Sequence, residues 1–116
     1  MSKDAPKFDP ALTEIMNRKF SAITDQMTVT LRRSSRSVYV KEGGDFGVAL
    51  IDLEGHTFAW PEATSVTCVD QYCGPVLEAV GPLVEGDVII TNDPYRSQGR
   101  ATHLPDLQLI KPYFHD

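Results

Sequence analysis

The sequence has few cysteines, no long apolar run and no excess of positive charge. Its two cysteines, Cys68 and Cys73, match neither a C-x-x-C redox motif nor a zinc-knuckle spacing. No stretch approaches the roughly 18 apolar residues of a membrane-spanning helix, and no signal peptide is recognisable. The net charge of −5 implies no general attraction to nucleic acid. We therefore expect a cytoplasmic protein that binds neither membranes nor nucleic acid.

The length of the chain limits it to one domain with a modest core. There are 116 residues, of which 41% are hydrophobic and 23% charged, as in an ordinary globular protein. The sequence contains no internal repeat and no low-complexity segment. The first eight residues are expected to be frayed, which leaves 9–116 as the folded segment.

Positive charge is concentrated in one place. Arg32, Arg33 and Arg36 follow one another closely, and Lys41 comes soon after. Such a cluster is usually a solvated face or a contact with a partner, and a site for an anionic ligand is the alternative.

A long amphipathic helix over 10–33 is the firmest structural prediction. Asp9 is a favourable N-cap, and Pro10 suits the first helical turn. Apolar side chains then recur at helical spacing and are expected to face the core. These residues are Leu12, Ile15, Met16, Phe20, Ile23, Met27 and Leu31.

The rest of the chain predicts short strands and one weak helix. His56 falls in the turn of a predicted β-hairpin and is interpreted as a solvated loop histidine. The fold class is therefore α+β, a long N-terminal amphipathic helix followed by a hairpin and further strands, as part of a larger subunit. The expected elements after the first helix are an extended piece at 38–40, the hairpin at 46–60, a helix at 75–80, a buried strand at 87–91 and a strand from 107 onward.

Two polar motifs flank the loop between the last two strands. Residues 92–95 read N-D-P-Y, and residues 103–106 read H-L-P-D. Side chains placed where a strand ends can be shaped for binding or catalysis, because the scaffold beneath them is rigid. This stretch is the predicted functional region.

Asp45, His103 and Asp106 are the candidate metal-binding or acid–base residues. Carboxylates and neutral imidazole suit Mn, Zn or Fe, and three protein ligands leave an open coordination position. Turn formation is the alternative role for Asp93 and Asp106, since Asp next to Pro often bonds to its own backbone.

The two motifs and their surroundings resemble the hydantoinase B/oxoprolinase family. Residues 86–95 (GDVIITNDPY) and 102–106 (THLPD) match a family pattern near the N-terminus of a large subunit. The Asp9-Pro10 helix start, Arg32-Arg33 and Asp45-Phe46 fit in order, so the resemblance covers about 8–115.

The resemblance implies a metal-dependent enzyme that works with other polypeptides. A hydantoinase A-like subunit would bind ATP and Mg and phosphorylate a small-molecule substrate. The B-type subunit would hold a divalent metal, Mn or Zn, through Asp45, His103 and Asp106. A further histidine would come from an H-x-D-x-G-G segment in the remaining B-type polypeptide. Asn92 and Asp93 would orient these ligands.

Three functions stay open on this resemblance. The first is an ATP-dependent amidohydrolase acting on a cyclic amide of the hydantoin, oxoproline or lactam type. The second is a subunit of an ATP-dependent ketone carboxylase, and the third is a non-catalytic assembly subunit. Two departures bear on the substrate: residues 64–70 lack the histidine of the P-V-H-L-G-S-M stretch in many relatives, and 42–47 read EGGDFG instead of E-R-x-D-F-S.

Overall fold

The computed structural model describes residues 8–62, 72–96 and 103–115. These residues form two compact units, one made of Met1–Leu50 and Thr57–Val69, the other of Ile51–His56 and Asp70–Asp116. Cys68, the departure at 64–70 and most of the expected frayed segment 1–8 lie outside the described residues. The combination of one long helix with small antiparallel strand pairs confirms the α+β fold class.

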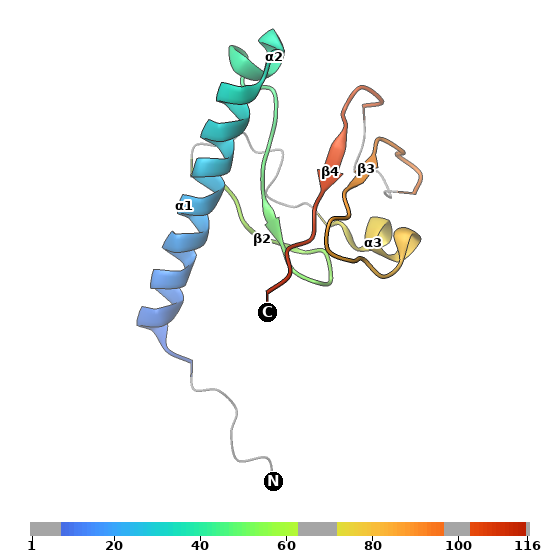
Figure 1. Cartoon of the computed structure of the whole chain (residues 1–116). Coiled ribbons are helices and arrows are strands. Elements are labelled where there is room, and N and C mark those ends of the chain that lie inside the picture. Colours follow the sequence, from blue (N-terminus) through green and yellow to red (C-terminus); the bar gives the residue numbers. More distant parts are fainter. Residues whose placement is uncertain (1–7, 63–71, 97–102, 116) are drawn as a thin grey trace. The chain divides into compact units, whose positions relative to one another are not determined.

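The first unit is built on α1 (Pro10–Ser34), the long helix in Figure 1. Its start is the predicted one, because Asp9 Oδ1 accepts hydrogen bonds from the N–H groups of Ala11 (2.9 Å) and Leu12 (3.2 Å). The helix ends one residue after the predicted boundary. The prediction of this element is confirmed.

The expectation that the apolar stripe of α1 forms a core is wrong for this chain. Leu12 is 55% exposed and Ile15 51%, while Thr24 is the residue of α1 that is fully buried. α1 contacts α2 and packs on β2 (Thr57–Ala59), where the rings of Phe20 and Phe58 meet edge to face with their centroids 5.1 Å apart. A strand of three residues cannot cover a helix of 25 residues, so most of the apolar stripe of α1 faces water.

The extended piece predicted at 38–40 is also wrong. These residues belong to α2 (Val38–Lys41), which follows the C-terminal end of α1 in Figure 1. The β-branched valines favour a strand. Two local hydrogen bonds nevertheless close a helical turn, one from the Lys41 N–H to the Ser37 carbonyl and one from the Glu42 N–H to the Val38 carbonyl, each 2.9 Å long.

The hairpin is confirmed, with shorter strands than expected. β1 (Leu50–Ile51) pairs with β2, and the turn between them covers 52–56. Gly55 has a φ of 93° and is buried, which a residue with a Cβ rarely tolerates. The turn is closed by bonds from the Asp52 N–H to the His56 carbonyl (2.9 Å) and from the Gly55 N–H to the Asp52 carbonyl (3.0 Å).

The second unit contains α3 (Gly74–Val80) and an antiparallel pair, β3 (Ile89–Thr91) and β4 (Gln108–Ile110). Figure 1 shows β3 and β4 side by side, in the register Ile89 with Ile110 and Thr91 with Gln108. The strand predicted as buried is buried on one face only, since Ile89 is 9% exposed and Ile90 62%. The reason is that β3 and β4 form a two-stranded ribbon, and no other described element covers its Ile90 face.

None of the helices in the described part of the chain is long and apolar enough to cross a membrane.

The exposed apolar stripe of α1 affects the stability of these 116 residues when they are isolated. We expect the isolated chain to bind a hydrophobic dye and to melt broadly, because its apolar surface is uncovered. Differential scanning calorimetry tests this, and a sharp cooperative transition of the monomer would contradict it.

Candidate functional site

The N-D-P-Y motif begins where β3 ends, and Asp93 shapes its turn. Asp93 Oδ1 accepts hydrogen bonds from the N–H groups of Tyr95 (2.8 Å) and Arg96 (3.1 Å), while Oδ2 lies 3.8 Å from Arg96 Nε. The Asp93 N–H in turn donates to Thr91 Oγ1 (3.2 Å). Asp93 therefore fixes the local backbone, which is the alternative role that sequence patterns assign to Asp beside Pro.

Asn92 connects the two motifs. Its Nδ2 donates a 2.8 Å hydrogen bond to the carbonyl of Leu104, twelve residues along the chain. Leu104 stands next to His103, so this one contact ties the end of β3 to the loop that carries the histidine. The predicted role of Asn92 in orienting metal ligands stays a prediction, and this hydrogen bond is the contact through which it would act.

His103 and Asp106 lie together on one exposed turn. The Asp106 N–H donates to the His103 carbonyl (2.9 Å), and His103 Nδ1 lies 3.6 Å from Asp106 Oδ2. Two ligands that are each about 2.0–2.2 Å from one tetrahedral zinc ion lie roughly 3.3–3.6 Å apart. The donor atoms and their spacing therefore fit a shared divalent ion with little movement.

Asp45 lies in the first unit, whereas His103 and Asp106 lie in the second. The Asp45 N–H donates to the Tyr39 carbonyl (3.0 Å), which fixes its backbone behind α2. Its side chain is exposed and makes no hydrogen bond or ion pair with any residue in the described ranges. The three-residue metal site of Asp45, His103 and Asp106 stays a prediction.

A second group of potential ligands lies in the hairpin turn, at Asp52, Glu54 and His56. Their ligand atoms all lie within 4.8 Å of one another, so the group could hold a metal ion. His56 Nδ1 is 3.5 Å from Asp52 Oδ2, and the His56 ring lies against Tyr72 at 4.7 Å. His56 is exposed, as the sequence suggested, but its partners were not foreseen. The signal was the spacing of acid, acid and histidine at alternate positions of a tight turn.

The Asp52 carboxylate has a pKa below its ordinary value. A hydrogen bond from the His56 backbone N–H to Asp52 Oδ1 (2.7 Å) is the main cause that lowers the Asp52 pKa below its ordinary value of 3.8, with help from the His56 charge. A lowered pKa keeps this carboxylate ionised, and thus able to bind a cation, to lower pH.

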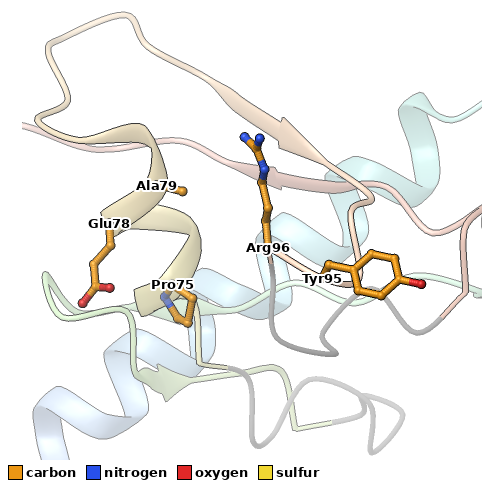
Figure 2. A pocket seen from close by; sticks show the side chains of 5 residues that line it. All are labelled: Pro75, Glu78, Ala79, Tyr95 and Arg96. Carbon is orange, nitrogen blue, oxygen red and sulfur yellow. The ribbon is translucent and has the colours of Figure 1, made fainter.

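A small pocket adjoins the N-D-P-Y turn in the second unit. Figure 2 shows Pro75, Glu78 and Ala79 of α3 on one side and Tyr95 and Arg96 on the other. Its volume is about 440 Å³, and it is a shallow hollow that is largely open to solvent. The Glu78 carboxylate and the Tyr95 hydroxyl point away from each other in Figure 2, so these polar groups do not converge on one ligand position.

The family pattern extends over nearly the whole chain. The model of the family described as hydantoinase B/oxoprolinase matches residues 9–116. This chain belongs to the hydantoinase B/oxoprolinase family. Both motifs lie within the matched residues: H-L-P-D is the turn that holds His103 and Asp106 together, and N-D-P-Y is the turn that Asp93 closes.

Similar proteins include several that are named 5-oxoprolinase. The 5-oxoprolinase of Saccharomyces cerevisiae is 38% identical over 112 residues, which is 91% of this chain and 8% of the yeast protein. The 5-oxoprolinase 1 of Arabidopsis thaliana is 33% identical over 114 residues, again 91% of this chain and 8% of the plant protein. An uncharacterised protein of Methanocaldococcus jannaschii is 31% identical over 115 residues, which is 93% of this chain and 20% of that protein.

The chain thus spans from less than a tenth to a fifth of the length of these relatives. No solved structure matches it.

Proposed function

We propose that this chain is the metal-binding part of an ATP-dependent amidohydrolase that acts on a cyclic amide of the hydantoin, oxoproline or lactam type. The support is its family, the naming of similar proteins as 5-oxoprolinases, and one contact in the second unit. That contact is the Asn92–Leu104 hydrogen bond, which joins the two family motifs beside the His103–Asp106 pair. We also propose that the enzyme works in the cytoplasm.

In this proposal Asp45, His103 and Asp106 hold Mn or Zn, with a further histidine from the remaining B-type polypeptide. A bound divalent ion would polarise the substrate carbonyl and lower the pKa of a bound water. The chain's own residues supply oxygen and nitrogen donors that suit both metals. Asn92 holds the His103 loop through Leu104, and Asp93 keeps the adjoining turn closed.

The chemistry of amide hydrolysis is the reason for proposing an ATP-dependent activation step. An amide carbonyl is a poor electrophile, so we propose that a hydantoinase A-like subunit binds ATP and Mg and phosphorylates the amide oxygen of the substrate. The exposed side chains of His103 and Asp106 would then face the activated substrate from the B-type side.

The alternative metal site consists of Asp52, Glu54 and His56, because these residues bring three donor atoms together within the second unit. The family motifs favour His103 and Asp106, whereas local geometry alone favours the hairpin turn. Single substitutions of His103 and of His56 distinguish the two sites.

The whole complex, purified with its natural partners, tests the proposed reaction. We expect near-stoichiometric Mn or Zn and ATP hydrolysis that depends on a cyclic amide and not on bicarbonate. ATP hydrolysis that requires bicarbonate together with a ketone would establish the carboxylase function instead. A complex without bound metal and without substrate-dependent ATP hydrolysis would establish a non-catalytic assembly role.

A further inference from the structure

The first arginine of the basic cluster is engaged with the loop that carries Asp45. The Arg32 guanidinium carbon lies 5.9 Å from the centre of the Phe46 ring, in a cation–π contact. The same guanidinium lies over Gly44, since a Cβ added to Gly44 would come within 2.7 Å of Arg32 Nη2. Arg32 therefore contacts both residues that flank Asp45 in the sequence.

The backbone of this loop is arranged to allow that approach. Gly44 has a φ of 66°, a left-handed conformation that glycine adopts without strain. The N–H of the next residue, Asp45, donates to the Tyr39 carbonyl (3.0 Å), and the N–H of Phe46 donates to the Gly44 carbonyl (2.9 Å). The loop is thus fixed to α2 by its backbone and to the last turns of α1 by Arg32.

The Asp45 carboxylate is left available between these contacts. Arg32 stacks on the neighbouring ring and makes no ion pair with a carboxylate in the described residues. A guanidinium that served only to balance charge would gain more from a bidentate bond to Asp45 than from a ring. Arg32 contacts the residues on both sides of Asp45, which points to a role in supporting this loop.

We propose that Arg32 is a positioning residue that holds the Asp45 loop against α1 and so sets the affinity of the metal site. The proposal rests on the proposed function, in which Asp45 is a metal ligand. Residues that support a ligand commonly tune metal affinity. The contact here is exposed, and cation–π contacts at exposed positions are worth only about a two- to fivefold change in affinity.

The sign of the effect separates positioning from simple electrostatics. A cation beside a metal site repels the metal, so removal of its charge alone would tighten metal binding. Loss of positioning would weaken metal binding, whether or not the charge is kept. The variants Arg32→Lys, which keeps the charge, and Arg32→Gln, which removes it, therefore give different patterns under the two roles.

The experiment measures Mn²⁺ affinity by calorimetric titration of the metal-stripped whole complex, with thermal stability followed in parallel. We expect Arg32→Lys, Arg32→Gln and Phe46→Leu each to weaken Mn²⁺ binding by about two- to fivefold. Activity should recover when Mn²⁺ is raised by the same factor, which a general loss of structure would not allow. Arg33→Gln is the matched control, because Arg33 is the next exposed arginine of α1 and makes no ion pair or ring contact in the described part of the chain.

Two patterns would overturn the proposal. One is unchanged affinity in Arg32→Lys together with tighter binding in Arg32→Gln, and the other is unchanged affinity in all three variants. The variant Asp45→Asn distinguishes failure of the Arg32 proposal from failure of the proposed metal site. If Asp45→Asn abolishes Mn²⁺ binding and the Arg32 variants do not weaken it, only the role of Arg32 fails. If Asp45→Asn also binds Mn²⁺ normally, the proposed metal site itself fails.

Discussion

Replacement of His103 by alanine should remove the tightly bound metal and reduce substrate-dependent ATP hydrolysis by more than about 100-fold. Loss of a direct metal ligand should have a larger effect than loss of a residue that only orients a ligand, which typically costs about 10- to 100-fold. His103 is exposed and contacts Asp106 at 3.6 Å on a local turn. Its truncation should therefore leave the subunit folded and the complex assembled. Elemental analysis, an ATP hydrolysis assay and size-exclusion chromatography of the purified complex measure the three parts of this expectation.

His56→Ala is the matched control for that experiment. His56 is another exposed histidine that faces an aspartate of its own turn, at 3.5 Å. The proposed site predicts that His56→Ala keeps its metal and its activity. The opposite pattern, with metal lost in His56→Ala and retained in His103→Ala, would transfer the site to Asp52, Glu54 and His56.

Substitution of Gly55 by alanine should open the second unit locally. A Cβ at Gly55 would press on the backbone nitrogen of Gly74 and lie 2.8 Å from the carbonyl carbon of Cys73. These are backbone atoms that cannot rotate away, and the φ of 93° adds its own strain. We expect a cost of roughly 2–5 kcal/mol from strain and overpacking together.

The buried thiol of Cys73 reports on this opening. Its backbone N–H donates to the Gly55 carbonyl (2.7 Å), so the two residues should separate together. In a Cys68→Ser background, the reaction of Cys73 with a thiol reagent should accelerate by about 30-fold or more in Gly55→Ala, if local opening governs access. Gly81→Ala is the control, because Gly81 has a φ of 82° with no atom near the added Cβ. Equal rates in the two variants would show that strain alone, and not the contact with α3, sets the cost.

The elements that sequence patterns predicted correctly are those fixed by neighbouring residues. Asp9 caps α1 through atoms two and three residues away, and α3 ends at Val80, where the sequence predicts its end. Residues 38–40 were assigned wrongly because side-chain preference favours a strand, whereas backbone bonds to Ser37 and Val38 close a helical turn. The stripe of α1 was assigned to a core because its period is clear, but a period does not say whether the rest of the chain is large enough to cover it.

The candidate site was predictable in part for the same reason. The motifs at 92–95 and 103–106 could be recognised from residue types, and the turns within each are local. The Asn92–Leu104 bond spans twelve residues, and the Arg32–Phe46 contact joins a helix to a loop beyond α2. Neither contact follows from spacing, because each depends on where separate elements meet in space.

The exposed apolar face of α1 also matters while the protein is being synthesised. α1 leaves the ribosome before the strands that follow it, and about 76 residues separate its end at Ser34 from the end of β4 at Ile110. At about 5–20 residues per second, that interval lasts roughly 4–15 seconds. During this time even Phe58, which packs on Phe20, is absent for part of the interval. Among residues 10–110, α1 is therefore the segment that a ribosome-associated chaperone would cover for the longest time.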